Sequence, residues 1–134
     1  MSPISEAELL ALVPSQSYIN GQWVDGSAGK TIDVFDPATG KVIKSIADAT
    51  PEDGIRALDA AVAAQEDWAA TPPRVRGELL RKAFDLVQER KDEFALLMTL
   101  EMGKPLAEAI GEVNYGSEFL RWFAEEAVRI NGRY

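Results

Sequence analysis

The sequence predicts a mixed α/β chain, more narrowly an α+β segment, in which two N-terminal β-hairpins precede a helical layer. Two turn sequences indicate the hairpins, because Asn20-Gly21 and residues 36–40 (DPATG) each separate short apolar runs. From Thr50 onward the apolar residues recur every three or four positions instead of every two. That change of period indicates helices for the rest of the chain.

Composition excludes several classes of function. A chain of 134 residues with 46% hydrophobic residues has the size of one domain. Its 14 Lys and Arg residues against 22 Asp and Glu residues give a net charge of -8, so we expect no nucleic-acid partner and no anionic membrane partner. The sequence contains no cysteine and no histidine. It therefore offers neither a thiolate nucleophile nor the usual general base.

The first 17 residues are interpreted as an N-terminal arm with one short helix. Ser5 is placed to cap this helix, which runs through Val13 until Pro14 stops it. Glu6 and Glu8 occupy the region in which a signal peptide would be basic and then apolar, and no later apolar run approaches the length of a membrane span. We therefore expect a cytoplasmic protein.

The two hairpins follow the arm. In the first, Asn20-Gly21 joins residues 18–19 to residues 22–24, and Asn-Gly is the strongest two-residue hairpin signal. In the second, apolar and polar residues alternate over 32–34, and apolar residues return over 42–46 after the turn. Each hairpin is a small antiparallel unit.

Helix boundaries are marked by proline, threonine and charge. Thr50 caps the first long helix with Pro51 in its first turn, and the face expected to be buried includes Ile55, Leu58 and Val62. Prolines 72 and 73 separate this helix from the next one. The charge-rich run QERKDE interrupts the apolar pattern of that second helix, so we expect a break at about residues 90–92.

The Gly-Lys pair in LEMGKPLAEA is interpreted as a corner between helices. A phosphate-binding loop needs a second upstream glycine and a Ser or Thr after the lysine, whereas here Pro105 follows Lys104. Gly103 is instead expected to end the third helix in a left-handed conformation. Pro105 then begins the last helix, which is predicted from about Leu106 toward Asn131-Gly132.

The last predicted helix carries more apolar surface than one core contact uses. One flank comprises Ile110, Val113, Leu120, Ala124 and Ala127, and a second flank comprises Tyr115, Phe119 and Trp122. A core contact needs a stripe roughly 100° wide, and this helix offers about twice that. Two interpretations stay open: the helix lies centrally and packs on both sides, or covering elements or a ligand channel belong to further chain.

Four segments, in this order, resemble the N-terminal part of the aldehyde dehydrogenase superfamily. They are YINGQWVDG, DVFDPATGKVI, LMTLEMGKPLAEAIGEVNY and FLRWFAEEAVRINGRY. The combination of MTLEMGKPLAEA with FLRWFAEEAVRI is most similar to NAD(P)-dependent succinate-semialdehyde dehydrogenase. The resemblance implies that residues 18–134 are the first part of the NAD(P)-binding domain, and that the chain ends before the catalytic domain.

The resemblance also implies an activity for the full-length protein. Family members oxidise an aldehyde by attack of a cysteine thiolate and hydride transfer to the nicotinamide. The resulting thioester is then hydrolysed by water that a glutamate activates. The implied reaction is succinate semialdehyde to succinate with NAD or NADP, and the implied assembly is a homo-oligomer. No catalytic or cofactor-binding residue is assigned in this chain, so we expect the 134 residues alone to be inactive and to bind no cofactor. The alternative is a free-standing helical protein-interaction module without catalysis.

One line of residues has an implied contact with substrate. In the family, the helix that matches residues 106–131 lines the tunnel by which the aldehyde reaches the cysteine. The tunnel-facing positions correspond to Gly111 and Tyr115, with Phe119 one turn further on. The alternative for Tyr115 and Phe119 is a role as ordinary core aromatics.

Other polar residues carry no predicted site. Glu125 and Glu126 are neighbours on a helix and point about 100° apart, so they cannot act as an acid/base pair. Ser117 has no histidine to activate it. Glu101 matches an acid that helps to hold a monovalent cation in some family members. Acidic residues near helix ends are common for other reasons, and no metal site is assigned.

Overall fold

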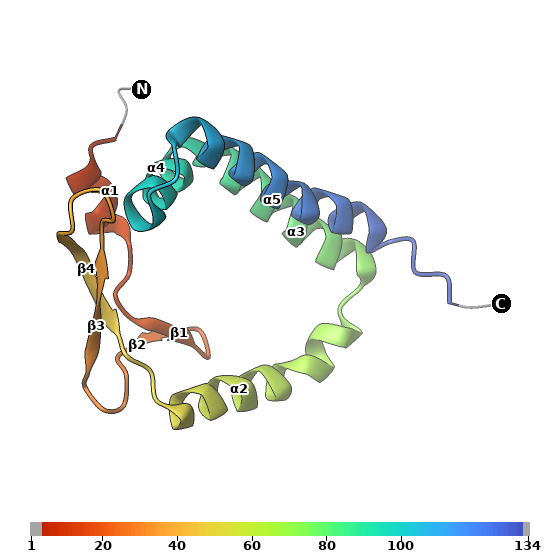
Figure 1. Ribbon diagram of the computed structural model, residues 1–134. Helices are drawn as coiled ribbons and strands as arrows, with labels where there is room; N and C mark the ends of the chain where they lie inside the picture. The colour runs from red at the N-terminus through yellow and green to blue at the C-terminus, as the bar shows by residue number, and fades with distance from the viewer. Residues whose placement is uncertain (1–3, 133–134) are drawn as a thin grey trace. The chain divides into compact units, whose positions relative to one another are not determined.

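A computed structural model describes residues 4–132 of the chain (Figure 1). The described residues divide into two compact units. The first unit contains the residues up to Ala69 together with Leu100–Gly103, and the second contains Ala70–Thr99 together with the residues from Lys104 onward. No helix in residues 4–132 is both long enough and apolar enough to cross a membrane.

The first unit begins with α1 (Glu6–Leu12), which confirms the predicted short helix. Ser5 and Glu8 close a capping box: the Ser5 hydroxyl accepts the Glu8 N–H at 3.3 Å, and the Glu8 carboxylate accepts the Ser5 N–H at 3.0 Å. Leu9 is the buried residue of the helix. The helix ends at Leu12, and Val13 is its C-cap directly before Pro14.

The first hairpin pairs β1 (Ser17–Ile19) with β2 (Gln22–Val24) in an antiparallel two-stranded sheet, as predicted. Asn20 and Gly21 have φ values of 51° and 77°, so both central turn residues are left-handed. A two-residue turn with positive φ at both positions matches the twist of the flanking strands. The Asn-Gly signal in the sequence therefore identified the turn correctly.

The second hairpin pairs β3 (Thr31–Phe35) with β4 (Val42–Ala47), and its register is irregular between Val34 and Phe35. Asp36 organises the turn, because its carboxylate accepts the Ala38 N–H at 2.8 Å and the Thr39 hydroxyl at 2.7 Å. These two donors lower the pKa of the Asp36 carboxyl, with the Thr39 hydroxyl contributing more.

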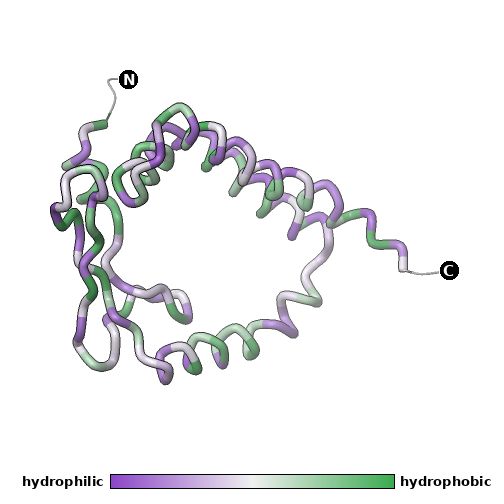
Figure 2. The backbone as a smooth tube through the Cα atoms, viewed as in Figure 1, coloured by the Kyte–Doolittle hydropathy of each residue, from purple (hydrophilic) through white to green (hydrophobic). Residues whose placement is uncertain are grey.

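Helix α2 (Pro51–Ala70) begins and ends where the sequence predicted. Its predicted buried face is wrong, however, since Ile55, Leu58 and Val62 are all exposed. In Figure 2 apolar segments recur along α2. The period of three and four identified the helix correctly, but the apolar side chains that it marks are exposed.

The second unit contains α3 (Pro73–Glu89), most of α4 (Lys91–Met102) and α5 (Leu106–Glu126). The predicted break between α3 and α4 is confirmed at Arg90. The core of this unit is small: Ala95, Ala109 and Val113 are buried, and Val87, Met98 and Ile110 pack against them. The main helix pair is α3 with α5.

The Gly103 corner is confirmed, and the end of the last helix is corrected. Gly103 has a φ of 76° directly after α4, and Pro105 lies just outside α5 as its N-cap. We predicted a helix running toward Asn131-Gly132, but α5 ends at Glu126. Val128 and Ile130 are exposed, so no packing within the described chain holds a further turn.

Candidate functional site

The strongest candidate site is the face of α5 formed by Tyr115, Phe119 and Trp122, called here the aromatic face. These side chains are 70%, 50% and 63% exposed, respectively. The spacing of four and three residues places them on one side of the helix. The rings of Tyr115 and Phe119 meet edge to face, with their centroids 5.3 Å apart and an angle of 88° between the ring planes. Edge-to-face contact is a favoured aromatic geometry, so the two rings hold one another in place.

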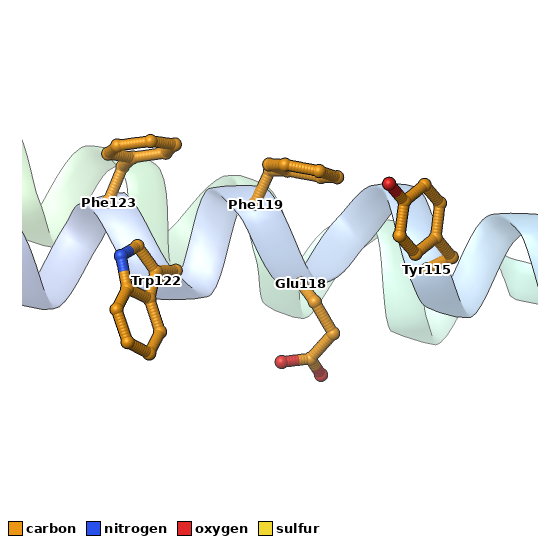
Figure 3. Close-up of a pocket in the computed structure, with 5 residues that line it drawn as sticks. All are labelled: Tyr115, Glu118, Phe119, Trp122 and Phe123. Atoms are coloured by element: carbon orange, nitrogen blue, oxygen red, sulfur yellow. The ribbon is translucent and has the colours of Figure 1, made fainter.

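The aromatic face borders an open hollow of about 330 Å³. Figure 3 shows its five lining residues along one stretch of α5, with Phe119 and Phe123 drawn above the helix in that view and Glu118 and Trp122 drawn below it. Glu118 accepts a hydrogen bond from Arg121 Nε at 2.8 Å, so its charge has a partner on the same helix. The walls are mainly hydrocarbon, and the Tyr115 hydroxyl and Trp122 indole N–H are the neutral polar groups. Such a surface suits an apolar chain that ends in a polar group.

Two of the three predicted tunnel residues lie together in this hollow. Tyr115 and Phe119 both line it, whereas Gly111 lies about one turn before Tyr115 on α5 and does not. No atom lies within 4 Å of the position that a Cβ on Gly111 would occupy. Within the described chain Tyr115 and Phe119 are not core aromatics, because both are exposed. The tunnel role of the three residues stays a prediction.

On the opposite side of α5, one polar residue is buried against α3. Ser117 is 3% exposed and accepts a hydrogen bond from Gln88 Nε2 at 2.7 Å. The serine that the sequence left without a catalytic role is therefore a buried contact between α3 and α5. Sequence reasoning missed Gln88 as its partner, because nothing in the spacing of the two residues indicates the contact.

The Gly-Lys corner does not present a phosphate site. Lys104 forms an ion pair with Glu112, and its side chain is mostly covered. Pro105 contributes no N–H, so the backbone beyond the lysine cannot ring a phosphate in the manner of a phosphate-binding loop. Among residues 4–132, no group of three or more His, Cys, Asp or Glu residues is placed to hold a metal ion.

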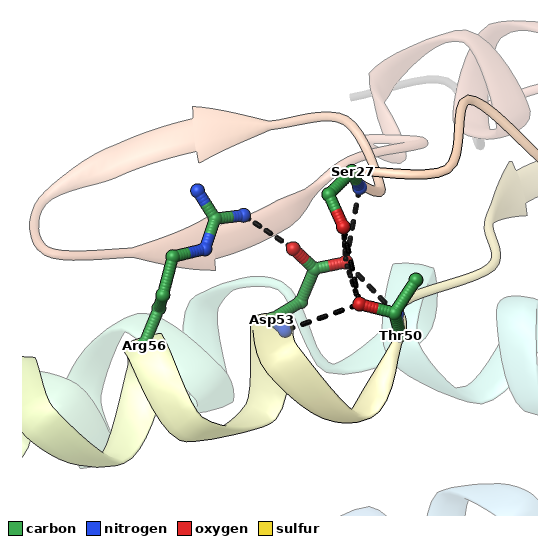
Figure 4. A network of polar contacts seen from close by, with 4 residues as sticks. All are labelled: Ser27, Thr50, Asp53 and Arg56. Atoms are coloured by element: carbon green, nitrogen blue, oxygen red, sulfur yellow. Dashed lines mark hydrogen bonds and ion pairs between the residues drawn. The ribbon is translucent and has the colours of Figure 1, made fainter.

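A buried carboxylate at the start of α2 was not anticipated from the sequence. Asp53 is 2% exposed and accepts the backbone N–H groups of Ser27 at 3.0 Å and Thr50 at 2.8 Å (Figure 4). Arg56 also pairs with it. The Ser27 N–H, followed by the Thr50 N–H, holds the pKa of the Asp53 carboxyl well below its usual range. The Thr-x-x-Asp spacing is a capping-box pattern that could have indicated this role.

Comparisons with known proteins identify the same family as the resemblance in the sequence. The sequence profile of the aldehyde dehydrogenase family matches residues 23–134. A succinate-semialdehyde dehydrogenase of Paenarthrobacter nicotinovorans is 67% identical over 93 residues, which make up 69% of this chain and 21% of that protein. A glutarate-semialdehyde dehydrogenase of Pseudomonas aeruginosa is 47% identical over 121 residues, which make up 90% of this chain and 25% of that protein. The chain thus spans about a quarter of the length of these curated relatives.

Solved structures agree with the sequence comparisons. The crystal structure of succinate-semialdehyde dehydrogenase from Burkholderia pseudomallei matches with a TM-score of 0.88 at 41% identity, over 92% of this chain and 26% of that chain. Betaine aldehyde dehydrogenase from Staphylococcus aureus in complex with NAD+ matches with a TM-score of 0.87 at 31% identity, over 90% of this chain and 24% of that chain. These matches confirm both the predicted resemblance and the predicted fold class.

Proposed function

The chain belongs to the aldehyde dehydrogenase family, and on that basis we propose that it is the N-terminal part of an enzyme that oxidises an aldehyde with NAD or NADP. Succinate semialdehyde is the proposed substrate and succinate the proposed product. The name of the relative at 67% identity supports this choice. The relative named for glutarate semialdehyde supports the wider class of short aldehydes that carry a carboxylate at the other end.

The aromatic face is the observation within this chain that carries the proposal. A tunnel for a short aldehyde needs an apolar wall that stays free of the chain's own core, and Tyr115 and Phe119 provide exposed rings in edge-to-face contact. The Tyr115 ring would face the hydrocarbon part of the aldehyde, and its hydroxyl would donate a hydrogen bond to the carboxylate tail. Gly111, one turn earlier, would leave room for the substrate because it has no side chain. These residues would bind and orient the aldehyde, and none of them would take part in the bond changes.

The oxidising chemistry is assigned to other parts of the full-length enzyme. NAD or NADP would accept the hydride when bound, but no described residue is assigned to hold it. The Gly-Lys corner does not fit the pyrophosphate, because Lys104 is paired with Glu112. The sequence has no cysteine to attack the aldehyde carbon. No bond change is therefore assigned to these 134 residues.

A direct experiment compares the full-length protein with the 134-residue chain. Each is incubated with succinate semialdehyde and with NAD+ or NADP+, and formation of the reduced cofactor is followed by absorbance. We expect turnover by the full-length protein and none by the chain alone, because the chain lacks the thiol nucleophile. Turnover by the pure chain would contradict the assignment of the chemistry to other parts of the enzyme. A full-length protein that oxidises no aldehyde would favour the alternative, a helical protein-interaction module without catalysis.

Several finer features stay predictions within this proposal. They are the choice between NAD and NADP, the homo-oligomeric state of the full-length enzyme, its cytoplasmic location, and the division into an arm at residues 1–17 and a cofactor-domain segment at residues 18–134.

A further inference from the structure

We propose that the contacts between α3 and α5 fix the rotation of α5 about its own axis and so aim the aromatic face. In this proposal Gln88 and Ser117 are positioning residues for the aldehyde, although neither touches it. The inference rests on the proposed function, because the direction of the aromatic face matters for activity only if substrate passes along it.

The polar contact between α3 and α5 tolerates little rotation. Gln88 Nε2 donates to the Ser117 hydroxyl at 2.7 Å, and that hydroxyl donates to the Asn114 carbonyl at 3.0 Å. Ser117 is 3% exposed, so water does not readily replace a lost partner. A turn of α5 that broke the bond would leave the half-buried Gln88 amide without this acceptor and the buried Ser117 oxygen without its donor, which is costly. The hydrogen bond therefore favours one rotational setting of α5.

A second contact lies about two turns further along α5. A Cβ on Gly77 of α3 would lie only 2.7 Å from the Ala124 carbonyl oxygen, so the two backbones approach closely at this point. Ser117 and Ala124 are seven residues apart, which is roughly 10 Å along the helix axis. Two contacts separated by that length fix both the direction of α5 and its rotation.

A third contact joins α3 to the edge of the hollow. The Arg121 guanidinium lies 5.8 Å from the centre of the Phe84 ring, on α3. The same guanidinium binds Glu118, which lines the hollow. The interface with α3 thus reaches a residue beside the aromatic face through a cation–π contact and an ion pair.

The aromatic face lies nearly opposite these contacts. At about 100° per residue, Tyr115 and Phe119 are each about 160° around the helix from Ser117, and Trp122 is about 140° away. Because a helix rotates as a rigid rod over this length, a turn at Ser117 moves the aromatic rings by the same angle. The interface with α3 can therefore set the direction of the rings without contact between them.

A double-substitution experiment on the full-length enzyme separates positioning from stability. The variants are Gln88→Met, Ser117→Ala and the pair together, with Lys82→Met as a control at an exposed position of α3. For each, kcat/KM is measured with succinate semialdehyde and with the bulkier benzaldehyde, alongside the cofactor KM and the melting temperature. The selectivity is the ratio of the two kcat/KM values.

Each single variant should melt earlier, because it removes one partner of a partly buried hydrogen bond, and the double variant should recover most of that loss. The selectivity should nevertheless change by about threefold or more in the double variant, because the bond that sets the rotation is absent there. The cofactor KM and the Lys82→Met control should stay near wild type. A double variant with wild-type selectivity would overturn this proposal alone. A wild-type protein that oxidises no aldehyde would overturn the proposed function and this inference with it.

Discussion

Thr50 and Asp53 exchange hydrogen bonds across the first turn of α2. The Thr50 N–H donates to the Asp53 carboxylate at 2.8 Å, and the Asp53 N–H donates to the Thr50 hydroxyl at 3.3 Å. The same carboxylate accepts the Ser27 N–H at 3.0 Å and the Ser27 hydroxyl at 3.1 Å. One side chain therefore both caps the helix and ties the loop after β2 to it.

Replacing Asp53 should release this loop. In Asp53→Ala the amide hydrogens of Ser27 and Thr50 lose their acceptor, so both should exchange with solvent faster. Hydrogen exchange read by mass spectrometry on peptides covering residues 24–54 measures the effect. Glu52→Ala is the matched control, since Glu52 lies in the same first turn but is exposed, and its exchange should stay close to wild type. Unchanged exchange in Asp53→Ala would contradict the role of this carboxylate.

The same carboxylate gives an acid-sensitive contribution to stability. Since hydrogen bonds hold the folded pKa of Asp53 below the unfolded value of roughly 3.9, folding favours the ionised form. The contribution should be fully present above about pH 4 and fall as the pH drops further toward the folded pKa. Urea unfolding between pH 7 and pH 3 checks this. The loss of stability on acidification should be smaller in Asp53→Asn than in wild type, and equal losses would show that Asp53 does not contribute.

Gly77 should not tolerate a side chain. An alanine Cβ at this position would lie 2.7 Å from the Ala124 carbonyl oxygen, and a backbone atom cannot swing aside. We expect Gly77→Ala to lower the free energy of unfolding by about 1–3 kcal/mol, in the range of other overpacking changes. Gly116→Ala is the matched control on α5, because nothing lies within 4 Å of its added Cβ. That control should be neutral or stabilise by about 0.4–1 kcal/mol in denaturant titrations. Equal effects of the two substitutions would refute the close approach.

The 134-residue chain on its own should expose apolar surface that a fluorescent hydrophobic dye can bind, or should self-associate. Ile55, Leu58 and Val62 on α2 and the aromatic face on α5 are all exposed. Contiguous apolar patches larger than several hundred Å² are rare on soluble monomers. Dye fluorescence and light scattering measure the two outcomes, and replacing both Phe119 and Trp122 by Gln should reduce them. A monodisperse chain that binds no dye would contradict the exposure seen in the structure.

Local signals in the sequence predicted most of the fold. Asn20-Gly21 identified the first turn, Gly103 identified the helix corner, and Ser5 identified the cap of α1, because each feature depends on residues close together in the chain. The end of α5 was predicted too late, because the apolar residues that continue the pattern, Val128 and Ile130, find nothing to pack against. Helix periodicity predicts which side of a helix is apolar, but whether that side is buried depends on an element that packs against it.

The candidate site was predictable only in part, for the same reason. The spacing of Tyr115, Phe119 and Trp122 placed them on one side of a helix, and the structure confirms this arrangement. The Gln88–Ser117 contact joins residues 29 positions apart, and no local pattern indicates such a pair. On α2 the helical period alone predicts a buried apolar side, but that side of the helix is exposed.

The substrate-tunnel role of Tyr115 is tested most directly by the kcat/KM of the full-length Tyr115→Ala variant with succinate semialdehyde. Tyr18→Ala in β1 is the matched control, since Tyr18 is also exposed, and Tyr115→Phe separates the ring from its hydroxyl. We predict that Tyr115→Ala lowers kcat/KM by about 5- to 30-fold, or about 1–2 kcal/mol, while the cofactor KM and the melting temperature change little. Unchanged substrate kinetics together with a large loss of stability would contradict the tunnel role, because Tyr115 would then be a packing residue and not part of the substrate path.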